Sequence, residues 1–141
     1  MKALYCVPVT GDDRRWLRRS VTQVMTRPVV SVAVETSLRQ ATAVMLGAGI
    51  RHLVVTGDSG RCEGVLAARA ITGAWATEPD LGLVAAGAVV ERAAVVTDEA
   101  TVGDAARVMR GHGGDAVAVV DGSGVAVGMF TSSDLIALLA G

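Results

Sequence analysis

The sequence predicts a mixed α/β (α+β) protein built from two βαββα units in tandem, packed against each other as a pseudo-twofold pair. Three observations support this fold class: an internal repeat, the same helix start signal in both copies, and two strand-like runs joined by a turn in each copy. Apolar residues make up 51% of the chain but aromatic residues only 3%, which favours a core of small side chains such as Ala and Val.

The repeat has an offset of 64 residues, as between Met45 and Met109, and needs no gap between residues 36–71 and 100–135. The matched positions are glycines, turn residues and apolar residues, which suggests that both copies share one backbone path. Further matches join Ala41 to Ala105, Gly49 to Gly113, Ser59 to Ser123, Gly60 to Gly124 and Gly64 to Gly128.

Residues 1–20 form a lead-in that has no obvious counterpart in the repeat. It contains a strand-like run from Ala3 to Val7, a turn at Gly11 to Asp13 and an arginine cluster from Arg14 to Arg19. The cluster could contact phosphate or an acidic partner. We prefer a solvated helical segment that docks on the core through Trp16 and Leu17.

Each repeat then begins a helix with a capping box, Ser37 to Gln40 and Thr101 to Asp104, in which two side chains satisfy the free amide groups of the helix start. Apolar residues at helical spacing follow, and glycines are expected to end the helices. These glycines are Gly47 and Gly49 in the first repeat, and Gly111, Gly113 and Gly114 in the second.

Two strands and a second helix complete each unit. The first strands are short continuous apolar runs, typical of strands covered on both faces, and turns rich in Gly, Asp and Ser follow them. In the first repeat the strand, turn, strand and helix are expected at 53–55, 57–60, 63–66 and 67–76; in the second at 117–120, 121–124, 125–130 and 132–140. The organisation is a lead-in (1–20), a first repeat (21–77), a linker (78–87) and a second repeat (88–141).

Composition also excludes several classes of protein. The longest apolar run, Leu81 to Val90, is far shorter than the roughly 20 residues of a membrane span, and no signal peptide precedes it, so we expect a cytoplasmic protein. A net charge of −1 gives no whole-protein argument for binding membrane or nucleic acid. Cys6 and Cys62 are expected to be reduced. Catalytic motifs and clusters of metal ligands are missing from the sequence, so we expect neither an enzyme nor a metal site.

The order of the motifs resembles the CBS domain pair, or Bateman module. The resemblance rests on the segments Val24 to Val30, Ile50 to Val55 and Gly128 to Asp134, and it covers residues 21 to 140. It implies a regulatory module that binds adenosine-containing ligands in clefts between the repeats. It also implies that two copies often pair into a flat disc of four repeats.

Thr131 and Asp134 are the leading candidates for the ligand site, since the resemblance implies that these positions hold ribose and phosphate. A carboxylate can accept hydrogen bonds from both ribose hydroxyls. The alternative is an ordinary helix cap. Because Ala67 and Ala70 occupy the same positions in the first repeat, the cap is not needed in both copies, and we expect one working site per chain.

Two further groups of residues complete the predicted site. Arg51 and His52 precede the first long strand, where the family often binds phosphate; the alternative is a solvated arginine and an interface histidine. The resemblance implies that Pro28, Val29 and Val30, the expected short first strand, enclose the base; a plain buried strand is equally compatible. His112 has no evident role and is expected at an exposed helix end.

The leading hypothesis is a homodimeric sensor of AMP, ADP, ATP or S-adenosylmethionine, read by an unidentified protein partner. A second hypothesis is an interaction module without a small ligand, in which Thr131 and Asp134 serve only as a cap. A third, weaker one lets the arginine cluster bind nucleic acid, with a steep salt dependence.

Overall fold

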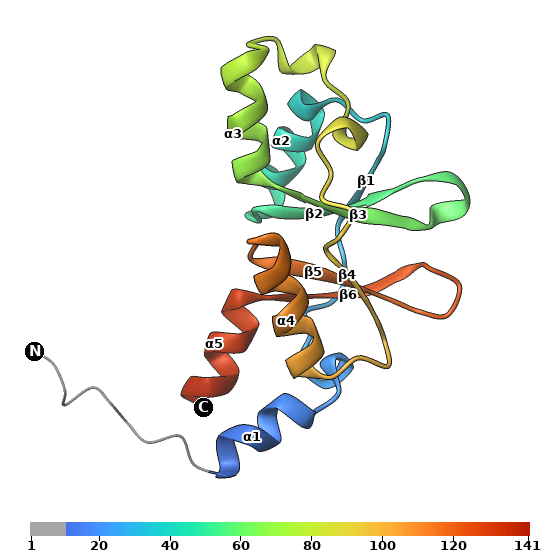
Figure 1. Ribbon diagram of the computed structural model, residues 1–141. Helices are drawn as coiled ribbons and strands as arrows, with labels where there is room; N and C mark the ends of the chain where they lie inside the picture. The colour runs from blue at the N-terminus through green and yellow to red at the C-terminus, as the bar shows by residue number, and fades with distance from the viewer. Residues whose placement is uncertain (1–10) are drawn as a thin grey trace, which may run out of the picture.

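The computed structural model describes residues 11–141, with side chains from Arg15 onward. The predicted strand from Ala3 to Val7, and Cys6, lie outside the described residues. Figure 1 shows two similar units stacked on each other, with their sheets facing in the middle and their helices on the outer faces. The tandem βαββα architecture predicted from the repeat is confirmed.

Each unit is a three-stranded sheet with two helices, as the bounds of the elements show. The first contains β1 (Ser31–Ala33), α2 (Leu38–Ala48), β2 (His52–Thr56), β3 (Cys62–Ala67) and α3 (Ala68–Thr77). The second contains β4 (Val95–Thr97), α4 (Val102–His112), β5 (Ala116–Val120), β6 (Ala126–Thr131) and α5 (Ser132–Ala140). The middle strand pairs in parallel with the short first strand and antiparallel with the third, in the same register in both units.

The predicted position of the short first strand, Pro28 to Val30, is wrong by three residues, because the strand is β1, Ser31–Ala33. The apolar residues before it are buried for another reason. Val29 packs against the core of the second repeat and Val30 against the core of the first. The segment therefore crosses from one repeat to the other.

The lead-in also differs from its predicted form. The expected turn at Gly11 to Asp13 is instead the first turn of a helix, α1 (Gly11–Arg18). The helix packs on α4, where the missing side chain of Gly103 leaves room for the Leu17 backbone. Trp16 is half-buried, whereas Leu17 remains 46% exposed, so the docking is shallow.

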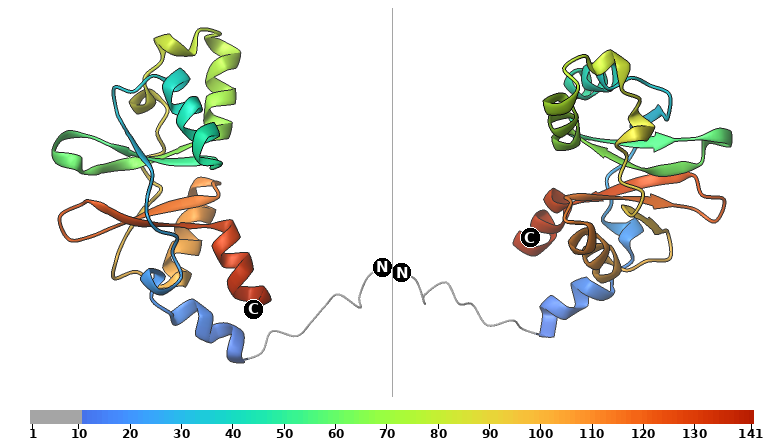
Figure 2. Two further views of the ribbon diagram at one scale, coloured as in Figure 1. Left: turned by 180° about the vertical axis from the view of Figure 1, so that it is seen from behind. Right: turned by 45° about the horizontal axis from the view of Figure 1, so that its top comes forward.

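The lead-in and the linker occupy equivalent places in the two units. Between α1 and the short helix η2 (Val21–Gln23), the Arg19 carbonyl accepts a hydrogen bond from the Val102 N–H of the second repeat at 2.8 Å. The linker, with short helices η4 (Leu81–Leu83) and η5 (Ala86–Ala88), repeats this contact on the first repeat, where the Val84 carbonyl accepts from the Leu38 N–H at 2.8 Å. Each segment that precedes a repeat thus packs on the other repeat (Figure 2).

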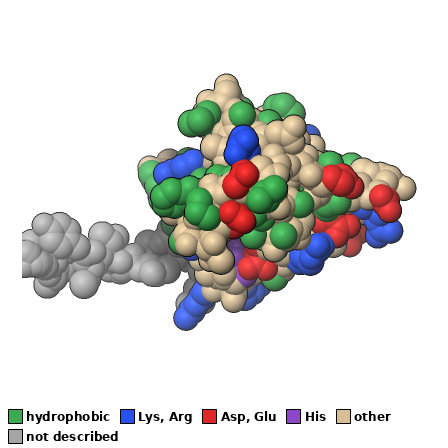
Figure 3. All heavy atoms as spheres, turned by 90° about the horizontal axis from the view of Figure 1, so that it is seen from above, with side chains coloured by type: hydrophobic (Ala, Val, Ile, Leu, Met, Phe, Trp, Pro, Cys, Tyr) green, Lys and Arg blue, Asp and Glu red, His purple; other side chains and the backbone are tan. Residues whose placement is uncertain are grey.

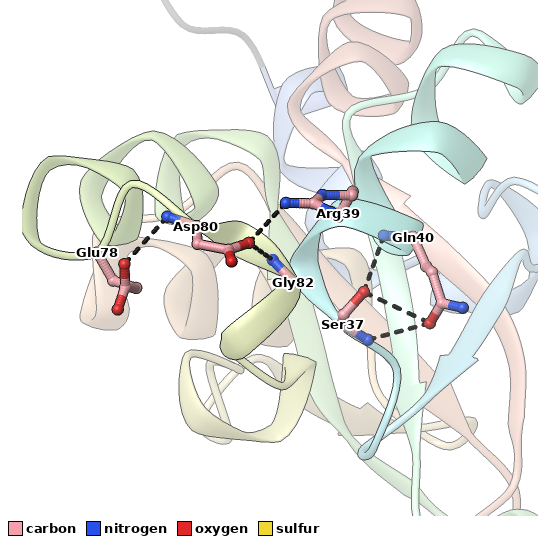
Figure 4. Close-up of polar contacts among 6 residues, drawn as sticks. All are labelled: Ser37, Arg39, Gln40, Glu78, Asp80 and Gly82. Atoms are coloured by element: carbon pink, nitrogen blue, oxygen red, sulfur yellow. Dashed lines mark hydrogen bonds and ion pairs between the residues drawn. The ribbon is translucent and has the colours of Figure 1, made fainter.

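Both predicted capping boxes are present, and Figure 4 shows the first of them. The Gln40 N–H donates to Ser37 Oγ at 3.1 Å, and the Gln40 side chain accepts from the Ser37 N–H at 3.3 Å. Beside it, Arg39 forms an ion pair with Asp80 of the linker. Gly49 and Gly113 follow the helices in the left-handed conformation, at φ of 68° and 69°. Gly47 and Gly111, predicted to end the helices, lie within them.

Small aliphatic side chains fill two adjoining cores, one in each repeat, as the composition predicts. The largest fully buried side chains are Phe130, Leu38, Leu53 and Leu66, and several valines surround them. Val54 and Val65 of the first sheet belong to the core of the second repeat, so the two sheets share a packed interface.

A glycine pair tests how this backbone is constrained. Gly64 adopts φ of 144°, and a Cβ there would overlap the Glu91 carbonyl. We expect Gly64→Ala to destabilise the protein by about 2–4 kcal/mol. Gly47, in α2, has open space around it, so Gly47→Ala should stabilise by up to about 1 kcal/mol. Urea unfolding measures both; equal effects of the two variants would contradict this account.

Candidate functional site

A cleft of about 380 Å³ opens between the two repeats. Its walls come from the segment that crosses between the repeats, from the turn between α2 and β2, and from the junction of β6 with α5. All the residues predicted for the site line this cleft except Asp134; they are Pro28, Val29, Val30, Arg51, His52 and Thr131. The structure therefore brings together positions separated by about a hundred residues in the sequence.

Asp134 lies directly behind the cleft wall, where it belongs to the cap of α5. Its Oδ2 accepts a hydrogen bond from the Thr131 N–H at 2.9 Å, and its own N–H donates to Thr131 Oγ1 at 3.3 Å. The helix cap that we weighed against a ligand role is thus present. It does not by itself exclude that role, because a carboxylate offers about four acceptor positions.

Thr26 is a member of the site that sequence reasoning missed. Its hydroxyl donates to the second oxygen of Asp134, Oδ1, at 2.7 Å, and Thr26 lines the cleft. A pair of backbone hydrogen bonds between Thr26 and Met129 places it there. The two side chains are 108 positions apart in the chain, and no local sequence pattern indicates the contact.

The apolar part of the lining also includes Ile50 and Met129 beside the three residues predicted to enclose the base. Val29 and Val30 are half-buried, and the lining contains no Phe, Tyr or Trp side chain. The repeat partner of Met129, Val65, lines the corresponding cleft of the other half. The aliphatic side chains of the larger cleft suit a flat, apolar group.

Arg51 and His52 add polar groups to the lining of the cleft. Within residues 15–141, the Arg51 side chain makes no hydrogen bond or ion pair. Burial lowers the pKa of His52 from its ordinary value of 6.5, and the charges of Arg51 and Arg69 lower it further, against the opposing effect of Asp115. The imidazole is therefore neutral near pH 7, which leaves Arg51 as the cationic group of the lining.

A second, smaller cleft of about 150 Å³ lies at the equivalent place in the other half. Ala67 and Ala70 line it in place of the capping pair, and the helix there begins without a side-chain cap, as predicted. His52 and Asp115 line both clefts, so the two meet at these residues. The capping pair of the larger cleft therefore has no counterpart in the smaller one.

The position of His112 differs from the predicted exposed helix end. It is half-buried beside the smaller cleft rather than exposed, and its Nε2 is buried without a hydrogen-bond partner. The reason is local: after α4 ends, the chain turns through Gly113, and the ring folds onto Gly114, which has no side chain to obstruct it.

A family model described as the CBS domain matches residues 21–76 and 86–141, which is most of the chain. The protein belongs to the CBS domain family. CBS domains are generally regulatory rather than catalytic modules, and the two matched segments coincide with the two structural units. The clefts described above lie between these two CBS repeats.

Solved CBS structures share the fold. The CBS domain protein PAE2072 from Pyrobaculum aerophilum, complexed with AMP, is 25% identical with a TM-score of 0.75, covering 86% of this chain and 99% of its own. The CBS domain pair of MJ0100, in complex with 5′-methylthioadenosine and S-adenosyl-L-methionine, is 21% identical with a TM-score of 0.77, covering 87% and 97%. TA0289 from Thermoplasma acidophilum is 27% identical with a TM-score of 0.76, covering 84% and 67%. No curated protein matches the chain significantly.

Among residues 11–141, none of the helices is both long enough and apolar enough to cross a bilayer. In the same part of the chain, no group of three or more His, Cys, Asp or Glu side chains is placed to hold a metal ion.

The lowered pKa of His52 predicts a pH dependence of stability. Unfolding restores the ordinary pKa of 6.5, so the unfolded state binds this proton more tightly and stability falls as the pH drops below about 6.5. In His52→Gln this contribution is absent. We expect the urea midpoint of the variant to fall less than that of the wild type between about pH 7.5 and 5.5. Parallel slopes would show that His52 titrates alike in both states.

Proposed function

We propose that this CBS protein is a regulatory module that binds an adenosine-containing ligand, such as AMP, ADP, ATP or S-adenosylmethionine, in the larger cleft. The observation that supports it best is the grouping around one cleft of Thr131 and Asp134, several aliphatic side chains, and Arg51, which forms no ion pair within residues 15–141. The AMP complex of PAE2072 and the S-adenosylmethionine complex of the MJ0100 pair support the ligand class.

Each part of such a ligand has matching groups in the cleft. The base lies in the slot formed by Pro28, Val29 and Val30. The ribose hydroxyls donate to Asp134, either beside Thr26 or in its place, since Thr26 already donates to Oδ1. The tail extends toward Arg51, whose guanidinium can bind an anionic group through two parallel hydrogen bonds. The start of α5 adds a favourable dipole for an anion.

Ligand binding regulates through the arrangement of the repeats. The cleft has walls from both CBS repeats and from the segment that crosses between them, so a ligand contacts all three. It shifts their relative orientation only by as much as it binds one arrangement better than another. A protein partner, still to be identified, reads this change.

The test compares two matched aspartates. Asp134 and Asp104 accept a hydrogen bond from the N–H of their cap threonine at the same distance, 2.9 Å, but only Asp134 adjoins the cleft. We expect Asp134→Asn to weaken AMP or S-adenosylmethionine binding about 10- to 100-fold, since hydrogen bonds to a charged group are lost. Asp104→Asn should cost similar stability, about 1 kcal/mol, and leave affinity unchanged. Isothermal calorimetry measures the affinities and urea unfolding the stabilities.

The second candidate function is an interaction module without a small ligand, and the observation that favours it is the complete cap of α5, which occupies Asp134 in the protein alone. Thermal unfolding with a panel of adenine nucleotides separates the two. A ligand at 100 times its dissociation constant adds about 2.7 kcal/mol of stability. A melting temperature that no member of the panel raises favours the interaction module.

We also propose that the protein is a homodimer that forms a disc of four repeats. The helices of both repeats lie on one side of the molecule and the hairpins on the other (Figures 1 and 2). Trp75 on α3 and Leu139 on α5 occupy equivalent repeat positions, and both are more than half exposed, as are Leu46 and Ile136. Hydrophobic side chains also lie exposed between charged ones in the view from above (Figure 3). A face with its own pseudo-twofold symmetry suits an isologous contact with a second copy.

An arginine scan of single positions tests the dimer. We expect Leu139→Arg to shift the protein to a monomer in size-exclusion chromatography with light scattering, because a charge would be buried in the contact. Val125→Arg, on the hairpin side, is the control and should leave the mass unchanged. A wild-type monomer, or a Leu139→Arg variant that keeps the dimer mass, would remove this face from the interface.

A further inference from the structure

Arg51 and Asp115 occupy the same position in the two repeats, and both line the larger cleft. Equivalent backbone contacts hold them: the Arg51 carbonyl accepts a hydrogen bond from the Ala68 N–H at 2.9 Å, and the Asp115 carbonyl accepts from the Ser132 N–H at 2.8 Å. The pseudo-twofold relation of the repeats therefore gives one cleft a cation and an anion from equivalent positions.

Neither the Arg51 nor the Asp115 side chain has a hydrogen-bond or ion-pair partner within residues 15–141. In the part of the chain with described side chains, Arg51 and Asp115 form no ion pair with each other or with any other residue, and neither side chain makes a hydrogen bond. Three ion pairs form elsewhere in the described residues, among them Arg107 with Asp104 at 2.7 Å. The two unpaired side chains are thus available to complementary groups of a ligand.

The balance of charge in the cleft argues against a purely anionic tail. Asp115 in the lining and Asp134 behind it carry two negative charges against the one positive charge of Arg51, and His52 is neutral near pH 7. Arg69, the other arginine near His52, lines the smaller cleft and donates to the Gly113 carbonyl at 2.6 Å. Within the lining of the larger cleft, a phosphate dianion bound at Arg51 would therefore meet the negative charge of Asp115.

We infer that the cleft selects an adenine nucleoside whose tail is an α-amino acid: the ligand carboxylate binds Arg51 and its ammonium group binds Asp115. This inference rests on the proposed adenosine site and narrows its ligand class. Carboxylate geometry matches the two parallel donors of a guanidinium, and an ammonium group paired with Asp115 neutralises the carboxylate that would repel a phosphate. Asp115 is then a specificity-determining residue at the position where the other repeat has an arginine.

Two ligands that differ only in the tail test the inference. S-adenosylhomocysteine carries the amino-acid tail, whereas 5′-methylthioadenosine has the same nucleoside without it. By calorimetry we expect S-adenosylhomocysteine to bind the wild type at least about 10-fold more tightly than 5′-methylthioadenosine, as hydrogen bonds between charged groups predict. Asp115→Asn and Arg51→Gln should each remove most of this difference, while 5′-methylthioadenosine binds all three proteins alike.

The affinity for AMP should change in the opposite direction when Asp115 is neutralised. We expect Asp115→Asn to strengthen AMP binding several-fold, because the repelling charge is removed, and Arg51→Gln to weaken it. Glu99→Gln, an exposed acid of the second repeat outside the cleft, is the control for net charge and should change no affinity.

The outcomes separate the inference from the function on which it rests. If 5′-methylthioadenosine or AMP binds and Asp134→Asn weakens it, but the amino-acid tail adds nothing or Asp115→Asn leaves the preference intact, the charge-pair inference is overturned and the adenosine site stands. If none of the three ligands binds the wild type, the charge-pair inference is overturned; if ADP and ATP also fail to bind, the adenosine site is overturned with it. Melting curves of the variants confirm that each is folded, which the exposure of both side chains leads us to expect.

Discussion

The exchange of segments between the two repeats is the contact on which the rest of the structure depends. The chain before each repeat hydrogen-bonds to the start of the first long helix of the other repeat, through Arg19 to Val102 and through Val84 to Leu38. Each segment then crosses back to begin a strand of its own sheet. Because both segments must cross between the repeats, they form walls of the two clefts, and neither cleft is complete without both halves.

The cap of α5 lies where one of these crossings meets the second repeat. Asp134 uses one oxygen for the cap and the other for Thr26 of the crossing segment. A group that competes for this carboxylate therefore acts on the helix start and on the crossing segment together. This coupling gives a local contact in the cleft a direct route to the arrangement of the repeats and of α1, which precedes the segment.

The two halves share a backbone but not a surface chemistry. Matching turns, caps and strand registers keep the pseudo-twofold frame, while single substitutions between the copies set the character of each cleft. Thr131 and Asp134 at the start of α5 correspond to alanines at the start of α3. Arg51 of the first repeat corresponds to Asp115 of the second. A duplicated frame with divergent side chains can thus hold one asymmetric ligand across a nearly symmetric junction.

The sequence by itself determined the fold of each unit, because local and periodic signals carry it. The offset of 64 residues, the capping boxes at Ser37 and Thr101, and the apolar runs before the Gly and Asp turns act within a few residues of one another. Comparison of the copies singled out Thr131, and the resemblance to the CBS domain pair singled out Arg51 and His52; the folded chain brings all three into one cleft.

Only the tertiary structure decided how the units interlock and what the cleft contains beyond those residues. Val29 and Val30 were predicted as a strand, since burial by two different cores leaves the same apolar pattern as burial in a sheet. Thr26 reaches Asp134 across 108 positions, Asp115 shares a cleft with Arg51, and His112 is half-buried by the turn at Gly113. These contacts arise from the crossing of segments and the packing of one repeat on the other, and sequence spacing does not encode the distances between residues that meet in this way.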